Sequence, residues 1–319
     1  MKDFSIVFMG TPEFAVAILD KLYIEGVSVK GVVTAPDKPS GRGQKINESA
    51  VKKYAVEKEL NILQPTNLKD EDFLAELKAL NADLFVVVAF RMLPQSVWSM
   101  PEKGTINLHA SLLPNYRGAA PINWAIINGE KESGVTTFFI EQEIDTGKII
   151  EQSKVPIGEN ETVGELYGRL MNLGADVMYS TVQKIAEGDI DSINQESLIS
   201  ENILPAPKIF KKDCKMDFSS TVESLHNFCR GLSPYPAAWC TLYNKDKKEE
   251  KSYKVLSTEK TTIEVSNQEQ VMSDKEGLLF PTSDYYLRVL EIQPEGKRKM
   301  NFKDFLAGNP VENLTTKGF

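Results

Sequence analysis

Short apolar runs alternate with helix-patterned segments over residues 5–188, and this alternation restricts the fold more than any other property of the chain. The run LFVVVAF at residues 84–90 is apolar at every position, which is typical of a strand buried on both faces of a parallel sheet. In residues 69–80, by contrast, apolar side chains recur every three or four positions, as on one face of a helix. The alternation predicts an open, mostly parallel α/β sheet with helices on both faces.

The expected catalytic domain covers residues 1–188. Its strands are predicted at 5–10, 27–34, 83–90, 105–110, 134–140 and 148–157, and its helices at 12–24, 48–60, 69–80, 120–128 and 162–188. Residues 36–47 contain two prolines and two glycines and are predicted to form a long loop. The motifs G-x-G-x-x-G and G-x-x-x-x-G-K-[ST] are both absent from the sequence, so the sheet is expected to be Rossmann-like without a dinucleotide fingerprint.

A different pattern begins after residue 188. Residues 189–208 are polar, contain two prolines and are predicted to be a linker. Residues 209–319 form the expected second domain, a small OB-like β-barrel of a kind that often binds oligonucleotides. Its strands are predicted at 237–243, 251–257, 261–266, 276–282 and 285–292, and its helices at 221–232 and 301–308.

Composition narrows the class of protein. The net charge is −8, but residues 1–205 carry 19 Lys and Arg against 29 Asp and Glu, whereas residues 206–319 carry 18 against 16. This asymmetry permits a nucleic-acid partner on the second domain without requiring one. Three widely spaced cysteines predict neither a disulfide framework nor a metal site. Without a signal peptide or an apolar stretch of about 20 residues, the chain is expected to be cytoplasmic, with no membrane partner.

Asn107 and His109 are the strongest candidates for chemistry. Side chains two residues apart in a strand share a face, so an amide donor and an imidazole are expected side by side at the end of the strand at 105–110. Such a pair could hold an oxyanion and move a proton, although a buried strand end with satisfied polar groups is the simpler alternative. Asp145, in the turn-forming sequence DTG, could orient His109 or simply cap the turn.

Basic residues form three further groups. Lys38, Arg42 and Lys45 lie in the expected loop at 36–47, which is either a solvated loop or a mobile arm that contacts a polyanion. In the second domain, basic residues cluster after the linker and again near the end of the chain. They are Lys208, Lys211, Lys212 and Lys215, and then Lys297, Arg298 and Lys299. Each could be an ordinary solvated charge, and together they could follow the phosphates of a nucleic acid.

Five segments carry a resemblance to a known family. They are FMGTPEFA (8–15), DKPSGRGQK (37–45), INLHASLLPNYRGAAPINWAI (106–126), DTG (145–147) and GLSPYPAAW (231–239). The pattern INLHxSLLPxxRGAAP resembles the folate-dependent formyltransferases, and the other segments narrow the resemblance to the methionyl-tRNA formyltransferases. The similarity spans nearly the whole chain.

The resemblance implies transfer of a formyl group from 10-formyltetrahydrofolate to the α-amine of methionyl initiator tRNA, by a monomer that needs no metal. It implies a catalytic trio of Asn107, His109 and Asp145, and contact between Arg42 and the tRNA acceptor stem. The folate site is implied among Phe90, Arg91, Met92 and Leu93 and the turn formed by Ser111, Leu112, Leu113 and Pro114. The alternatives are another folate-dependent formyl enzyme, such as a sugar-amine or glycinamide ribonucleotide formyltransferase or a 10-formyltetrahydrofolate hydrolase, and a noncatalytic RNA-binding protein.

Overall fold

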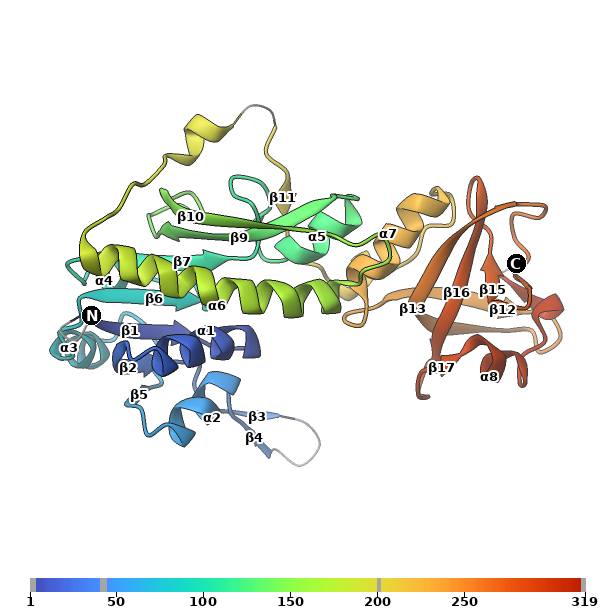
Figure 1. The fold of residues 1–319 in the computed structure, drawn as a ribbon. Helices are drawn as coiled ribbons and strands as arrows, with labels where there is room; N and C mark the ends of the chain where they lie inside the picture. Colours follow the sequence, from blue (N-terminus) through green and yellow to red (C-terminus); the bar gives the residue numbers. More distant parts are fainter. Residues whose placement is uncertain (1–3, 41–44, 200–201, 317–319) are drawn as a thin grey trace. The chain divides into compact units, whose positions relative to one another are not determined.

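The computed structural model describes residues 4–40, 45–199 and 202–316, and the chain divides into two compact units (Figure 1). Unit 1 comprises Met1–Gly118, Gly134–Val155 and Gly168–Pro205. Unit 2 comprises Ala119–Ser133, Pro156–Tyr167 and Ala206–Phe319, so two short excursions of the chain join unit 2 before the second domain begins.

Unit 1 is built on a seven-stranded sheet with the order β10-β9-β7-β6-β1-β2-β5. The strands are β1 (Ser5–Gly10), β2 (Ser28–Val33), β5 (Ile62–Leu63), β6 (Leu84–Val88), β7 (Thr105–His109), β9 (Glu132–Phe139) and β10 (Ile149–Pro156). The five strands from β7 to β5 in this order pair in parallel, whereas β9 runs antiparallel to β7. The expected mostly parallel α/β sheet is therefore confirmed.

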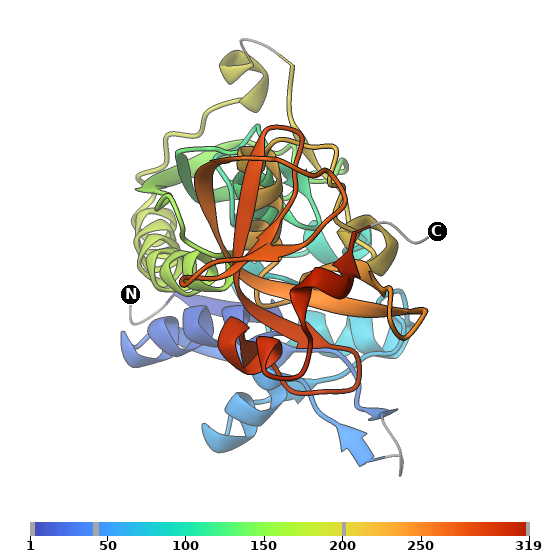
Figure 2. The same cartoon turned by 90° about the vertical axis from the view of Figure 1, so that its right-hand side faces the viewer.

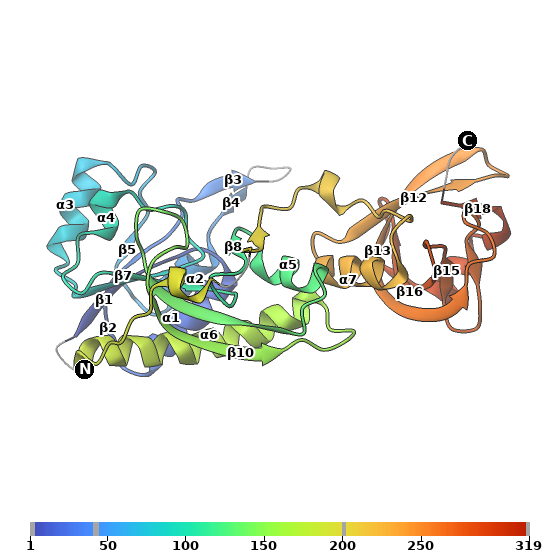
Figure 3. The ribbon, with the colours of Figure 1, turned by 90° about the horizontal axis from the view of Figure 1, so that it is seen from above.

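Helices cover both faces of this sheet (Figure 3). They are α1 (Glu13–Ile24), α2 (Ala50–Glu57), α3 (Glu71–Ala79), α4 (Gln95–Trp98) and the long α6 (Val163–Glu187). Phe73 of α3 and Val97 of α4 pack with Val7, Phe85 and Val87 in one buried cluster. Helices α1 and α6 lie on the opposite face, where residue Leu108 of β7 lies against Gly174 of α6.

Local sequence explains where two of these helices begin. Ser49 accepts a hydrogen bond from the backbone N–H of Lys52 at the start of α2, and Asp70 accepts one from Phe73 at the start of α3. Each side chain satisfies one of the free N–H groups that a helix N-terminus exposes, which stabilises the helix by about 1 kcal/mol.

Two segments differ from the sequence-based expectation. The predicted loop at 36–47 contains a short antiparallel pair, β3 (Lys38–Ser40) and β4 (Lys45–Asn47), because backbone pairing does not depend on side-chain polarity. The polar segment predicted as a linker contains the short helix η1 (Gln195–Leu198), and the Gln195 side chain is completely buried. Residues Arg117–Gly118 form β8, and Pro205–Ala206 form β11.

Unit 2 contains a curled antiparallel sheet with the order β14-β15-β16-β13-β12-β18, and β17 pairs with β16 (Figure 2). The strands are β12 (Ala238–Asn244), β13 (Glu249–Glu264), β14 (Met272–Ser273), β15 (Leu278–Phe280), β16 (Tyr285–Pro294), β17 (Met300–Asn301) and β18 (Leu314–Thr315). The two predicted strands at 251–257 and 261–266 are one strand, β13, whose pairing with β16 shifts register along its length. The Val271 N–H donates to the Leu314 carbonyl, so the two ends of the sheet meet and the expected small β-domain is confirmed.

Unit 2 also contains helices. They are α5 (Pro121–Ile127), α7 (Val222–Leu232), α8 (Phe302–Leu306), η2 (Lys211–Cys214) and η3 (Val311–Asn313). Leu225 and Leu232 of α7 and Phe305 of α8 pack with Val255 and Val289 of the sheet in one buried core.

Candidate active site

The end of β7 presents the two residues that the sequence singles out. Leu108 contacts α6, so Asn107 and His109 lie on the other face of the strand, as the period of two predicts. His109 is buried, with 7% of its surface exposed, and Asn107 is half-buried. Within the described part of the chain, the Asn107 side-chain amide has no hydrogen-bond partner. The strand end therefore holds an amide donor that is available to a ligand.

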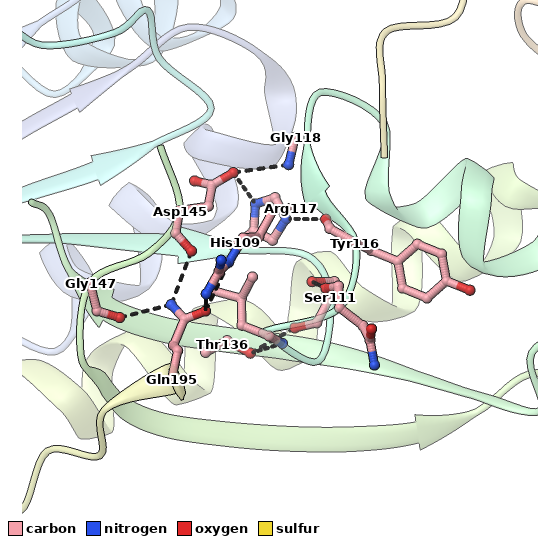
Figure 4. A network of polar contacts seen from close by, with 11 residues as sticks. His109, Ser111, Tyr116, Arg117, Gly118, Thr136, Asp145, Gly147 and Gln195 are labelled. Carbon is pink, nitrogen blue, oxygen red and sulfur yellow. Dashed lines mark hydrogen bonds and ion pairs between the residues drawn. The ribbon is translucent and has the colours of Figure 1, made fainter. Parts of the chain in front are cut away.

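Two oxygens hold the His109 ring between them (Figure 4). Its Nε2 lies 2.8 Å from the carbonyl oxygen of Tyr116, and its Nδ1 lies 3.8 Å from Oδ2 of Asp145. Because a carbonyl only accepts, Nε2 carries the hydrogen and donates it to Tyr116. In the neutral ring, Nδ1 is then the unprotonated nitrogen, and it faces the carboxylate at a distance too long for a direct hydrogen bond.

Three consecutive residues just beyond the SLLP turn (residues 111–114) all contact this site, namely Tyr116, Arg117 and Gly118. The Tyr116 carbonyl accepts from His109, the Gly118 N–H donates to Asp145 Oδ2 at 3.0 Å, and the Arg117 guanidinium donates to Gln195. Tyr116 has a positive φ of 62°, an uncommon conformation for a residue with a side chain. Tyr116 and Gly118 thus fix the imidazole and the carboxylate through their backbone, and Arg117 between them fixes the buried Gln195 amide through its side chain.

Asp145 lies in the connection between β9 and β10, and its side chain is 12% exposed. Its own φ is 57°, again in the left-handed region that costs a residue with a Cβ about 1–2 kcal/mol. Two residues later, Gly147 approaches the neighbouring strand so closely that a Cβ would lie 1.7 Å from the Phe139 carbonyl oxygen. The sequence DTG therefore forms a turn that directs the Asp145 carboxylate toward His109, and the Gly118 N–H, which lies outside this turn, donates to that carboxylate.

The SLLP turn after β7 is fixed by polar contacts with β9 and β10. Thr136 Oγ1 donates to the Ser111 carbonyl at 2.7 Å, and Gln152 Nε2 donates to the Leu113 carbonyl at 3.0 Å. Ser111, Leu113 and Pro114 are buried, and Leu112 is half-buried. These hydrogen bonds and the burial hold this part of the predicted folate site in a fixed conformation after the end of β7.

A pocket of about 590 Å³ lies at the other predicted folate segment. It is lined by residues 66–69 and 91–96, and therefore includes Arg91, Met92 and Leu93 but not Phe90 or the SLLP turn. Met92 is 71% exposed, and the Arg91 guanidinium lies 5.6 Å from the centre of the Phe90 ring. Burial lowers the pKa of Arg91, whose guanidinium donates to the backbone carbonyls of Pro65 and Thr66.

Unit 2 has its own groove, of about 710 Å³, and it brings part of the predicted basic cluster together. Four lysines line it together with Trp239 and Tyr235, the latter 81% exposed. The lysines are Lys208, Lys211, Lys254 and Lys297. Lys254 has no counterpart in the sequence-based prediction, because it lies in the middle of β13 and far from the other lysines in sequence.

The remaining predicted basic residues lie elsewhere. Lys212, Lys215 and Arg298 are exposed and do not line the groove, and Lys299 forms an ion pair with Glu291 at 3.3 Å. Lys38 is exposed on β3, Lys45 begins β4, and Arg42 lies outside the described residues.

Two negative findings apply to residues 4–40, 45–199 and 202–316. These residues contain no group of three or more His, Cys, Asp or Glu side chains placed to hold a metal ion. None of their helices is both long enough and apolar enough to cross a membrane.

Comparison with known proteins agrees with this architecture. Residues 4–182 match the family described as formyl transferase, and residues 208–310 match the formyl transferase C-terminal domain. The chain therefore belongs to the formyl transferases, a family whose enzymes use formyl-tetrahydrofolate.

Proteins of similar sequence identify the family within the formyl transferases more narrowly. The chain is 52% identical to methionyl-tRNA formyltransferase of Flavobacterium johnsoniae, with 97% of each chain covered, and 47% identical to that of Bacteroides fragilis, with 96% of this chain and 95% of the relative covered. It belongs to the methionyl-tRNA formyltransferase family. Among solved structures, the Helicobacter canadensis N-formyltransferase in complex with folinic acid and dTDP-3-aminofucose matches 91% of this chain and 99% of its own with a TM-score of 0.65; at 21% identity, this likeness shows the fold alone.

Proposed function

We propose that Asn107, His109 and Asp145 carry out the formyl transfer to methionyl initiator tRNA that defines the family. The observation that carries this proposal is their convergence: an amide without a partner, an imidazole of fixed tautomer and a carboxylate meet at one strand end. The α-amine of methionine attacks the formyl carbon of 10-formyltetrahydrofolate and forms the new C–N bond. The bond between that carbon and the folate nitrogen then breaks, and tetrahydrofolate leaves with a proton on this nitrogen, which balances the proton that the amine loses.

Asn107 stabilises the charge that develops on the formyl oxygen. Its side-chain NH₂ is half-buried and unpaired within the described residues, so it can donate to that oxygen without first breaking another hydrogen bond. A donor held in place before the reaction needs no reorganisation when the charge appears, which is why such donors contribute strongly to acyl transfer.

His109 and Asp145 handle the proton that the amine must lose. The Tyr116 carbonyl holds the hydrogen on Nε2, so the free lone pair of the neutral ring is on Nδ1. A proton accepted at Nδ1 creates an imidazolium that faces the Asp145 carboxylate 3.8 Å away, and this opposite charge stabilises it. In this scheme Asp145 orients and stabilises the imidazole, and a bridging water can carry the proton between the two groups.

The pocket beside Arg91 suits part of a folate. Its volume of about 590 Å³ lies within the range of small-molecule sites. Leu93 and Met92 offer apolar surface to a ring system, and Arg91 and Lys69 offer positive charge to carboxylates. We assign Phe90, Arg91, Met92 and Leu93 to binding the donor, together with the turn formed by Ser111, Leu112, Leu113 and Pro114 after the end of β7.

The tRNA is proposed to contact the groove of unit 2. Lysines around an exposed tyrosine and a tryptophan combine charge for phosphates with ring surfaces for bases. Lys208, Lys211 and Lys297 line this groove, and Lys212, Arg298 and Lys299 are assigned to its flanks. The segment from Lys38 to Lys45 is proposed as a second contact, through Lys38 on β3, Lys45 on β4 and Arg42, which lies between them in sequence and outside the described residues. A monomer acting in the cytoplasm, with no metal, is sufficient for this scheme.

A formylation assay tests the proposal. Wild-type protein is incubated with 10-formyltetrahydrofolate and charged initiator tRNA, and formyl-methionyl-tRNA is measured beside the variant His109→Ala. We expect formylation by the wild type and a loss of about 100-fold or more in the variant, the size typical of an acid–base group. Release of tetrahydrofolate in the absence of tRNA would instead indicate a hydrolase, and formylation of a nucleotide-linked amino sugar would indicate a sugar-amine enzyme.

A further inference from the structure

One buried amide joins the segments that build the active site. Gln195 has no exposed surface, although it lies in a polar stretch with no apolar pattern. Its Oε1 accepts from Arg117 at 3.1 Å from Nε and 2.7 Å from Nη2. Its Nε2 donates to the carbonyl of Asp145 at 3.0 Å and to that of Gly147 at 2.8 Å (Figure 4).

These partners fix the orientation of the amide. A guanidinium only donates and a backbone carbonyl only accepts, so a flipped amide would place NH₂ against Arg117 and oxygen against two oxygens. A glutamine side chain can make four hydrogen bonds, and all four are made here. A buried polar group with every bond satisfied is rigid, whereas a partly satisfied one is costly.

The carbonyl that Gln195 holds belongs to the residue with the catalytic carboxylate. Asp145 is in a left-handed conformation that an isolated turn would leave, so the surrounding contacts must hold it there. Three such contacts lie in unit 1: the Gly118 N–H on Oδ2, and the two bonds that Gln195 donates to the Asp145 and Gly147 carbonyls. Arg117, bonded to Gln195, lies between Tyr116 and Gly118, which contact His109 and Asp145.

We propose that Gln195 is a positioning residue for the formyl transfer: it sets the distance between Asp145 and His109 by tying the Asp145 turn to the segment 116–118. This inference rests on the proposed function. Gln195 is fully buried, so it acts through Asp145 and does not contact the substrate itself. Its loss should leave the amide, imidazole and carboxylate chemically intact but displace the carboxylate from the imidazole.

Two variants test the role. Gln195→Met keeps the volume and removes all four hydrogen bonds, and Gln195→Glu keeps an acceptor for Arg117 but replaces the donor to the turn by a second oxygen. A displacement of about 1 Å near reacting groups can cost on the order of 100-fold, so we expect both variants to lower kcat by roughly 10- to 100-fold with the KM for methionyl-tRNA little changed. If Gln195→Met fails to fold, Gln195→Glu decides the matter.

A double-mutant cycle separates positioning from general structural damage. If Gln195 acts through the Asp145 carboxylate, Gln195→Glu should lower kcat by less than about twofold in an Asp145→Asn background. A purely structural role would lower it by the same factor in both backgrounds and would overturn the proposal, as would a wild-type kcat in Gln195→Glu.

Gln270→Met in unit 2 is the matched control. The Gln270 side chain also donates to backbone carbonyls, those of Val271, Val311 and Leu314, and its loss should leave kcat within about twofold of the wild type. A wild type that formylates no tRNA would contradict the proposed function, whereas an active wild type with an unaffected Gln195→Glu would contradict only the role of Gln195.

Discussion

The amide of Asn107 is the group in this site whose contribution can be isolated most directly. It has no partner within the described residues, so its removal breaks no hydrogen bond among them. Asn107→Ala should lower kcat by about 100- to 1,000-fold, the usual cost of losing an oxyanion donor, with little change in the KM for tRNA. Steady-state kinetics beside Asn160→Ala, a substitution of an exposed asparagine in unit 2, provide the measurement. A rise in KM alone would contradict the role.

The second histidine gives the protein a predictable response to pH. His226 is buried, with Nδ1 2.9 Å from Thr258 Oγ1, and burial followed by the charge of Arg230 lowers its pKa from 6.5 to about 4. Above pH 6.5 the ring is neutral in the folded and unfolded states. As the pH falls from 6.5 to about 4, only the unfolded state gains the proton, so up to about 3 kcal/mol of stability is lost.

Urea unfolding of the wild type and of His226→Gln at several pH values measures this effect. The variant should be less stable at pH 8 but should lose less stability than the wild type between pH 6.5 and 4. Equal losses in the two proteins would show that His226 does not carry this part of the acid sensitivity.

Single residues also show how far sequence reasoning reaches. Asn107 and His109 could be predicted to share a face because the strand period is a local property of the chain. Gln195 could not, because nothing within its own segment distinguishes it from a solvated residue: its burial and all four of its hydrogen bonds come from contacts with residues 117, 145 and 147. The burial of Gln195 and its hydrogen bonds therefore depend on tertiary structure and could not be predicted from local sequence.

At the scale of elements, the connection between β9 and β10 has less freedom than its DTG sequence indicates. A Cβ on Gly147 would lie 1.7 Å from the Phe139 carbonyl oxygen, a backbone atom that cannot move alone. Gly147→Ala should therefore destabilise the protein by about 1–3 kcal/mol and displace Asp145, with a loss of activity of at least about 100-fold.

Gly168→Ala is the matched control for this prediction. Gly168 lies within α6, and a Cβ there would meet no atom within 4 Å. Alanine favours a helix over glycine by about 0.5–1 kcal/mol, so this variant should be slightly more stable and fully active. Thermal melting temperatures and formylation rates of Gly147→Ala and Gly168→Ala test this prediction. A fully active Gly147→Ala would show that the turn can accommodate a Cβ at residue 147 without loss of function.

Elements with a strong repeating pattern were predictable, and those defined by pairing were not. The long helix α6 extends from Val163 to Glu187, close to the predicted 162–188, because its apolar face repeats over many turns. Strand β13 was predicted as two strands, because its polar and charged residues interrupt the apolar alternation while its backbone continues to pair with β12 and β16. The pair β3–β4 was missed for the same reason, in a polar segment that also contains two prolines and two glycines.

At the scale of the whole molecule, the two parts of the chain differ in net charge. Residues 1–205 have an excess of ten acidic groups, whereas residues 206–319 have an excess of two basic groups. The lysines that line the groove of unit 2 come from three separate parts of the chain, at 208–211, 254 and 297, and the sheet brings them together. The sequence indicated which part of the chain could bind a polyanion, but only the folded sheet defines the surface.

This surface makes tRNA binding by unit 2 testable through its dependence on salt. Binding to phosphates releases counterions, so the logarithm of affinity falls with the logarithm of salt concentration by about 0.7–0.9 for each contact. In the double variant Lys208→Glu and Lys211→Glu, the tRNA Kd should rise by at least about tenfold at low salt and the slope should fall by about one to two. The kcat at saturating tRNA should change little, because the proposed catalytic residues Asn107, His109 and Asp145 lie in unit 1.

The double variant Lys247→Glu and Lys275→Glu is the control for this prediction. It has the same net charge, but its exposed lysines do not line the groove, so its slope should be close to that of the wild type. Equal effects of the two double variants would indicate that tRNA responds to the overall charge of unit 2. A lower slope in the first variant alone would locate phosphate contacts at the groove, because counterion release counts contacts at the site and is insensitive to distant screened charges.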